Sequence, residues 1–295
     1  MVATSSARDD GSPGASSLTE ETLHLGASGE VVGILSRPPS PKPGLPAVMF
    51  LKAGVIHRVG PHRLHVTLAR HLAVRGFTGL RLDLSGIGDS PLPGAVPFRE
   101  QAVVDVRAAM DSLGELAGVR RFVLFGLCSG ADNGLSTALA DERVVGLVLI
   151  DSFTYVTLRS SVRKLVTRAQ KLGTPRRFAE WGARLVVRRL RARVAAALGN
   201  DMSAPEQSGR EPPPAKVFGL QLETLLARGV RLLACCSGAL EERYNHKDQL
   251  FELLPGLRGR VDLSYYPEAN HLFTERLARR RLISDVTDWL ERHYA

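Results

Sequence analysis

The sequence predicts a doubly wound α/β fold with a mainly parallel sheet. Short apolar runs, typical of buried strands, alternate with segments in which apolar residues recur at helical spacing. A helix separates most of these strands, and parallel pairing needs such crossovers. With 295 residues, the chain is long enough for one large domain of this class.

The N-terminal part divides into a tail and the start of the sheet. Residues 1–20 are rich in Ser, Gly, Asp and Ala without periodicity, and we expect a disordered tail there. Residues 21–38 read as two strands joined by a turn that contains glycine, and a proline-rich link follows at 38–43. The α/β domain is therefore expected to cover residues 21–295.

The next elements alternate as the fold class requires. Residues 47–54 form an apolar run that predicts a strand buried on both faces. Helical spacing over 61–75 ends at Gly76, a good helix stop. A strand is expected over 78–86 and a helix over 99–117.

The second half continues the pattern with one interruption. We expect strands over 120–126, 144–153, 230–238 and 260–269, and helices over 131–140 and 277–294. Residues of about 155–215 are helical by pattern but contain no strand. We interpret them as a helical lid inserted over the carboxyl edge of the sheet.

Composition excludes several classes of protein. Hydrophobic residues make up 44%, charged residues 23%, and the mean hydropathy is −0.03, which excludes a disordered or fibrous chain. No apolar run approaches the roughly 18 residues that span a bilayer, and the N-terminus lacks the apolar core of a secretory signal. Three cysteines, two of them adjacent (Cys235 and Cys236), form no disulfide framework, so a cytoplasmic location is expected.

The net charge of +9 is local. Residues 159–193 hold twelve Lys and Arg residues and one acid, Glu180, so the rest of the chain is close to neutral. Residues 183–198 form an amphipathic helix by pattern, with arginines over most of its surface. Three interpretations stay open: a lid with solvated charges, a surface for an anionic membrane, and a site for an anionic ligand. In the last, Arg184, Arg188 and Arg191 would bind coenzyme A phosphates or an acyl carrier protein. No nucleic-acid module accompanies the charge.

A nucleophile is expected directly after the strand at 120–126. The sequence Gly126-Leu127-Cys128-Ser129-Gly130 lies between this strand and a helix. A sharp strand–turn–helix needs small residues two before and two after its central residue. Cys128 meets this condition and Ser129 does not, because Leu127 is large. The start of the helix also favours a thiolate at Cys128.

These residues resemble the nucleophile elbow of the α/β-hydrolase superfamily, with cysteine in place of serine. The segment 83–90 (Asp-Leu-Ser-Gly-Ile-Gly-Asp-Ser) is similar to the Asp-x-Arg-Gly-x-Gly-x-Ser turn of serine-aminopeptidase-type hydrolases within that superfamily. Here Ser85 replaces the arginine. The resemblance covers residues 22–294 and implies a catalytic triad.

The resemblance points to a base and an acid. Of eight histidines, His271 lies in the loop after the last strand, where the family carries its catalytic histidine. The family places the acid after the next-to-last strand, commonly three residues past a glycine. This spacing selects Glu241, with Glu242 as the alternate. Asp151 is a second candidate, because some members of the superfamily take the acid from that strand end.

An oxyanion hole needs two backbone N–H donors. The resemblance assigns one to Ser129, the residue after the nucleophile. The second comes from the loop Lys52-Ala53-Gly54-Val55, where the family usually has His-Gly. We expect Val55 as the second donor, and Gly54 as the alternate.

A cysteine nucleophile favours activated acyl substrates, because the acyl-cysteine intermediate is itself a thioester. The leading hypothesis is an acyl hydrolase of thioesterase or esterase type that uses Cys128, His271 and Glu241. One alternative is an acyltransferase that passes the acyl group from a coenzyme A or carrier-protein thioester to an amine or alcohol. Another is a non-catalytic binding protein on a hydrolase fold. No metal-ligand spacing or phosphate-binding glycine loop occurs, so no cofactor is expected.

Overall fold

A computed structural model of the chain shows the fold. It describes residues 18–26, 29–91, 97–174, 212–240 and 243–295, together with isolated positions at 176–177, 180, 182–184 and 187. The expected tail lies almost wholly outside the described residues, as does about half of the expected lid.

The described strands form one eight-stranded sheet in the order β1-β2-β4-β3-β5-β6-β7-β8. β1 and β2 form an antiparallel hairpin, β2 also pairs antiparallel with β4, and every further pairing is parallel. The strands are β1 (Thr19–Leu25), β2 (Val31–Arg37), β3 (Ala47–Leu51), β4 (Gly79–Leu82), β5 (Phe122–Leu127), β6 (Val144–Ile150), β7 (Arg231–Ser237) and β8 (Asp262–Tyr266).

The connecting elements agree with the predicted alternation. The helices are α1 (Leu64–Ala73), α2 (Phe98–Ala117), α3 (Ser129–Ala140), α4 (Leu158–Leu172), α6 (Ala215–Ala227), α7 (Gln249–Leu253) and α8 (Arg276–Tyr294), with 3-10 turns at η1 (Pro61–Arg63), η2 (Gly238–Leu240) and η3 (Pro255–Leu257). The predicted doubly wound α/β architecture is therefore confirmed.

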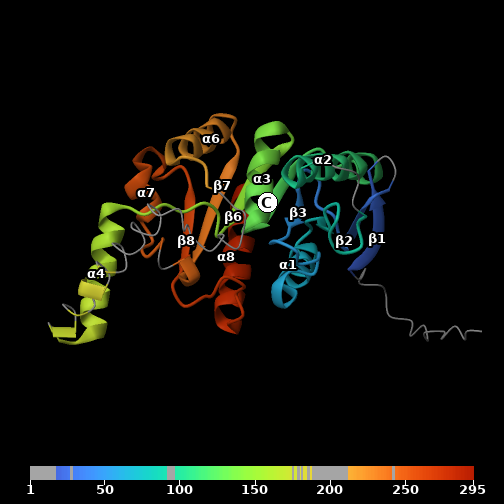
Figure 1. Ribbon diagram of the computed structural model, residues 1–295. Helices are drawn as coiled ribbons and strands as arrows, with labels where there is room; N and C mark the ends of the chain where they lie inside the picture. The colour runs from blue at the N-terminus through green and yellow to red at the C-terminus, as the bar shows by residue number, and fades with distance from the viewer. Residues whose placement is uncertain are drawn as a thin grey trace, which may run out of the picture.

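Helices cover both faces of the sheet, as Figure 1 shows. α1 and α8 pack on one face through residues such as Leu68 and Val286, and α2, α3 and α6 pack on the other through Val106, Leu135 and Leu222. The strands between the two layers are buried on both faces, which explains why they read as continuous apolar runs.

α4 departs from this layered arrangement. It begins with a capping box, in which the Thr157 side chain accepts from the Ser160 backbone N–H and the Ser160 side chain accepts from the Thr157 backbone N–H. In Figure 1 it projects from the end of the sheet that carries β8 and α7. The described parts of the expected lid are thus α4, the positions that follow it and the start of α6.

The parallel strands align their carboxyl ends at one edge of the sheet. Lys52 follows β3, Cys128 follows β5, Asp151 follows β6, and Ser237 ends β7. Reactive side chains from distant parts of the sequence are brought together there. No helix among the described residues is both long and apolar enough to span a membrane.

Candidate active site

Cys128 occupies a sharp turn between β5 and α3. Its backbone has φ 56° and ψ −118°, a conformation that residues other than glycine rarely adopt. A Cβ on Gly126 would collide with the backbone of Gly130, and a Cβ on Gly130 would collide with the carbonyl of Leu51. Glycine is therefore required on both sides of Cys128, for the reason that the sequence pattern suggested.

His271 lies in the loop after β8 and contacts an acid. Its Nδ1 is 2.8 Å from Oδ2 of Asp151. Asp151 has no exposed surface, and its backbone φ of 47° turns the chain sharply after β6. This turn directs the carboxylate toward the loop after β8 rather than along the strand.

The carboxylate of Asp151 is held from β7 as well. Its Oδ1 accepts a hydrogen bond from the backbone N–H of Ser237 at 2.7 Å, and its Oδ2 accepts one from the Ser237 hydroxyl at 2.6 Å. A buried carboxylate with several donors is satisfied in its charged form. The segments after β6 and β8 and the end of β7 therefore meet at one carboxylate.

The environment of His271 favours the imidazolium. The hydrogen bond with Asp151, and next the one with Cys128, raise the pKa of His271 to about 10 against the opposing effect of burial. A pKa in this range favours the charged ring of His271 at neutral pH. Because Nδ1 is engaged by Asp151, the other ring nitrogen is the one available to the thiol.

Of the acids that the sequence offers, the structure brings Asp151 to His271. Asp151, the second candidate from the sequence, makes the hydrogen bond that the sequence analysis assigned to Glu241. Glu241 and its alternate Glu242 lie outside the described residues. The spacing argument from Gly238 failed to identify the partner of His271 because that carboxylate comes from the end of β6. In the sequence, the feature that could have identified Asp151 is its position: a single carboxylate directly after the seven-residue strand β6.

The expected oxyanion loop contacts the elbow directly. The backbone N–H of Gly54 donates to the hydroxyl of Ser129 at 2.7 Å, and Gly54 has φ +50°. Val55, the expected donor, is 86% exposed in the same turn. Ser129 begins α3, so its own N–H lies at a helix N-terminus beside Cys128. Sequence reasoning missed the role of the Ser129 hydroxyl in joining the two loops.

Lys52, which directly follows β3, is almost fully buried at 1% exposure. Its Nζ has no hydrogen-bond partner among the described residues. Burial lowers the pKa of Lys52 to about 8, although Asp83 and Asp105 act in the opposite direction.

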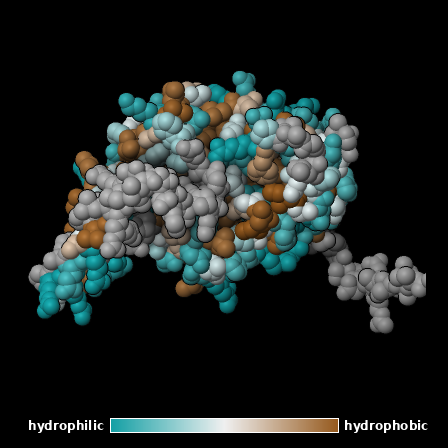
Figure 2. Space-filling model, viewed as in Figure 1, coloured by the Kyte–Doolittle hydropathy of each residue, from teal (hydrophilic) through white to brown (hydrophobic). Residues whose placement is uncertain are grey.

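The basic part of the predicted lid is described only in part. Arg184 is exposed, whereas Arg188 and Arg191 lie outside the described residues. α4 exposes four apolar side chains, Leu158, Val162, Leu165 and Val166, whose spacing places them on one helical face. Figure 2 shows hydrophilic residues gathered at the outer end of this helix.

One basic residue of α4 anchors the helix to the domain. Arg163 donates to Glu252 of α7 at 2.6 Å and to Asn245 at 3.0 Å. Between α4 and the ends of β7 and β8 lies a cavity of about 480 Å³ lined by residues that include Arg163, Lys164 and Tyr265. Within the part of the chain that the structure describes, no cluster of three or more His, Cys, Asp or Glu is arranged to hold a metal ion.

Comparison with known proteins supports the fold assignment. No protein-family model and no curated protein sequence matches the chain. Solved structures are similar in fold at low sequence identity. An esterase of Pyrococcus furiosus superposes with a TM-score of 0.60 at 13% identity, covering 99% of this chain and 98% of its own.

Two further structures agree. Proline iminopeptidase of Mycobacterium smegmatis has a TM-score of 0.54 at 16% identity, over 93% of this chain and 98% of its own. An esterase of Thermogutta terrifontis has a TM-score of 0.54 at 17% identity, over 94% of this chain and 100% of its own. Together with the sheet order, these similarities show that the chain has the α/β-hydrolase fold.

Proposed function

We propose that the chain is an acyl hydrolase of thioesterase or esterase type that works through a covalent acyl-Cys128 intermediate. The observation that carries this proposal is the 2.8 Å hydrogen bond between His271 and the buried Asp151, beside a cysteine held in a strained turn. Esterases and a peptidase among the structures of similar fold agree with hydrolytic chemistry.

The first half-reaction uses the charge state of the pair. His271, with a pKa of about 10, stays protonated at neutral pH and stabilises a Cys128 thiolate. The thiolate attacks the acyl carbon, and the carbonyl oxygen takes up the electron pair. Backbone N–H groups of Ser129 and of the turn at 52–55 stabilise this oxyanion. When it collapses, the bond to the leaving group breaks, and His271 donates its proton to the leaving sulfur or oxygen.

The second half-reaction returns the enzyme to its starting state. The neutral His271 now accepts a proton from water while the water oxygen attacks the acyl-cysteine. Cys128 departs as a thiolate, the carboxylic acid is released, and the imidazolium is restored. Asp151 acts throughout as a positioning residue, because it fixes the tautomer of His271 and stabilises the charged ring.

Sulfur at the nucleophile position narrows the substrate class. Transfer of an acyl group from one thiol to another is nearly thermoneutral, whereas attack on an unactivated amide is uphill. The basic segment favours an anionic carrier such as coenzyme A or an acyl carrier protein. The cavity beside α4, with Arg163 and Lys164 in its lining, is large enough for part of such a leaving group.

Turnover of acyl-CoA donors and of p-nitrophenyl esters by the wild type and by Cys128→Ala tests this proposal. We expect Cys128→Ala to lose at least a thousand-fold in kcat with its circular dichroism unchanged. Intact-mass spectrometry of the wild type, quenched with acid during turnover, should reveal an acyl adduct on Cys128 that is absent from Cys128→Ala. Full activity in Cys128→Ala would overturn the mechanism.

The same assay separates the alternatives. Amide or ester products formed in the presence of amines or alcohols, in excess over free acid, would assign acyl transfer. An unreactive Cys128 together with tight binding of an anionic carrier would assign a binding protein instead.

A further inference from the structure

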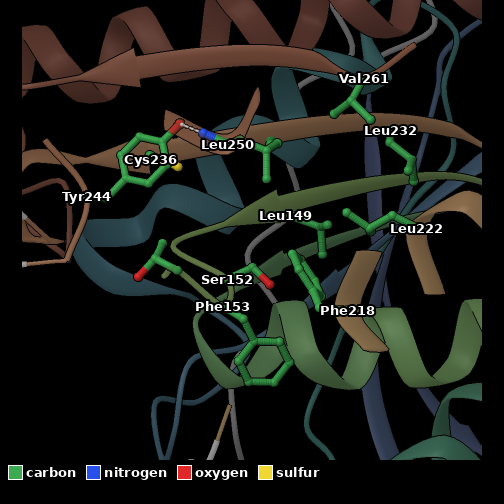
Figure 3. Close-up of a pocket in the computed structure, with 12 residues that line it drawn as sticks. Leu149, Ser152, Phe153, Phe218, Leu222, Leu232, Cys236, Tyr244, Leu250 and Val261 are labelled. Atoms are coloured by element: carbon green, nitrogen blue, oxygen red, sulfur yellow. Dashed lines mark hydrogen bonds between the residues drawn. The ribbon is translucent and has the colours of Figure 1, made fainter. Parts of the chain in front are cut away.

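A small apolar pocket lies next to the candidate acid. It is bounded by β6, β7 and α6, on the face of the sheet that carries α3 (Figure 3). Ser152 in its wall directly follows Asp151, and Cys236 directly precedes Ser237, which holds the Asp151 carboxylate. The lining of the pocket therefore includes a sequence neighbour of the acid after β6 and a sequence neighbour of Ser237 on β7.

The walls of this pocket are mostly aliphatic and aromatic. Leu149 and Leu232 line it from the sheet, Phe218 and Leu222 line it from α6, and Phe153 comes from the segment after β6. In Figure 3 Ser152 lies beside Leu149 and Phe218. A lining of this kind does not hold water well, because a bound water needs two or more polar partners.

The polar groups of the pocket differ in how they are satisfied. At one end the Tyr244 hydroxyl accepts from the Leu250 N–H at 3.4 Å and is also hydrogen-bonded with Cys236. By contrast, the hydroxyl of Ser152 is buried and has no hydrogen-bond partner among the described residues. An unpaired hydroxyl in an apolar pocket is costly unless a ligand supplies its partner.

The size of the pocket limits what it can hold. Its volume is about 30 Å³, whereas a single water requires about 10–15 Å³ on the same measure. A chain of about two to four carbons fits this space, and a longer chain does not unless the walls move.

We propose that this pocket binds the tail of the substrate's acyl group, and that the preferred substrates are short acyl thioesters or esters. Ser152 then acts as a specificity residue that hydrogen-bonds an oxygen substituent on the tail. This inference rests on the proposed function, since the acyl group is attached to Cys128 during the reaction.

Two substitutions change the pocket volume in opposite directions. Leu222→Ala enlarges the pocket, and Ala234→Val fills it. Leu220→Ala is the matched control, because Leu220 lies on the same helix but is 64% exposed, whereas Leu222 is 2% exposed. Initial rates with acetyl, butyryl, hexanoyl and octanoyl thioesters of coenzyme A give kcat/KM for each variant, and thermal unfolding confirms that each is folded.

The wild type and Leu220→Ala should prefer butyryl over octanoyl by at least ten-fold. Leu222→Ala should move the optimum to hexanoyl or longer, and Ala234→Val should move it to acetyl. Ser152→Ala should leave the length optimum unchanged but lose the preference for 3-hydroxybutyryl over butyryl. An active enzyme whose length profile is the same in all variants would overturn the pocket assignment and leave the triad intact.

A binding measurement separates this inference from the proposed function. Fluorine NMR with 4,4,4-trifluorobutanamide needs no turnover. We expect binding to the wild type and to Leu220→Ala, and at least ten-fold weaker binding to Ala234→Val. Equal binding to all three proteins would reject the pocket, even if no substrate were hydrolysed.

Discussion

The loops after β3 and β6 lie on either side of β5, the strand that leads to Cys128. Each loop buries an ionisable side chain, but the two side chains differ in their hydrogen-bond partners. After β6, Asp151 is fully buried and has donors from Ser237 and His271. After β3, the amine of Lys52 is buried with no hydrogen-bond partner among the described residues. The hydrogen bond with Asp151 raises the pKa of His271, whereas burial lowers the pKa of Lys52. Satisfied buried charge stabilises an ion pair for chemistry, whereas unsatisfied charge reduces stability.

The largest effect is expected on the β6 side. Asp151→Asn keeps the shape of the side chain but removes its charge, so His271 loses the group that fixes its tautomer. We expect kcat to fall by about a hundred- to ten-thousand-fold, and the pKa of His271 to fall from about 10 toward its ordinary value. Steady-state kinetics and an NMR titration of His271 measure the two effects.

The matched control is Glu241→Gln, which removes the acid that sequence spacing selected. Its kcat should stay within two-fold of the wild type. A large loss in Glu241→Gln with none in Asp151→Asn would reverse the assignment of the acid.

On the β3 side, Lys52→Met removes the unpaired amine. In the unfolded chain the amine has its ordinary pKa of 10.5, and in the folded chain the pKa is about 8. The unfolded chain therefore binds more protons between these values, and the folded state gains stability as pH rises through them. Lys52→Met should be more stable than the wild type by about 3 kcal/mol at pH 7, and most of this gain should be lost by pH 10.5. Urea unfolding at both pH values measures this, and a gain that does not depend on pH would contradict it.

His65 extends the comparison to a second buried group. It packs against the rings of Phe50 and Phe125, and both of its ring nitrogens are buried. Burial, with a smaller effect from Arg81, lowers the pKa of His65 to about 3. Below pH 6.5 the unfolded chain binds a proton at His65 and the folded chain does not. The free energy of unfolding therefore decreases as the pH falls. At pH 5 this loss is about 2 kcal/mol.

His65→Leu should remove this acid sensitivity. The difference in the free energy of unfolding between pH 7 and pH 5 should shrink by about 2 kcal/mol relative to the wild type. Chemical denaturation at the two pH values tests it. An unchanged difference would mean that His65 is protonated in the folded state.

The smallest effect is expected at Ser237, which donates hydrogen bonds to Asp151. Ser237→Ala removes one donor to Asp151 but keeps the backbone N–H that binds Oδ1. We expect kcat to fall about ten-fold, since one hydrogen bond to a charged group contributes about 1.5 kcal/mol. Ser237→Thr, which keeps the hydroxyl, should restore most of the loss. A similar loss in both variants would indicate a packing defect.

The comparison also shows what a sequence can and cannot predict. The elbow was predictable because Gly126 and Gly130 are required by close backbone contacts within a few residues of Cys128. The alternation of strands and helices was predictable because each is local. His271 was selected by its place after the last strand, and the structure brings it to Asp151.

The acid was harder to identify because its identity depends on a tertiary arrangement. The left-handed backbone of Asp151 and the donors of Ser237, which is 86 residues away, decide which carboxylate meets His271. The bond between Gly54 and Ser129 is also long-range, joining residues 75 positions apart. Spacing within one loop contains no information about such contacts.

The central claim is that Cys128 and His271 form a thiolate–imidazolium pair oriented by Asp151. Intact-mass measurement of Cys128 labelling by a low dose of iodoacetamide, from pH 5 to 9, tests it most directly in the wild type, His271→Ala and Asp151→Asn. Fast labelling of Cys128 at pH 6 in the wild type, and slow labelling in both variants, is the predicted result. Labelling that rises only near pH 8.5 and is the same in all three proteins would show an ordinary thiol and contradict the account.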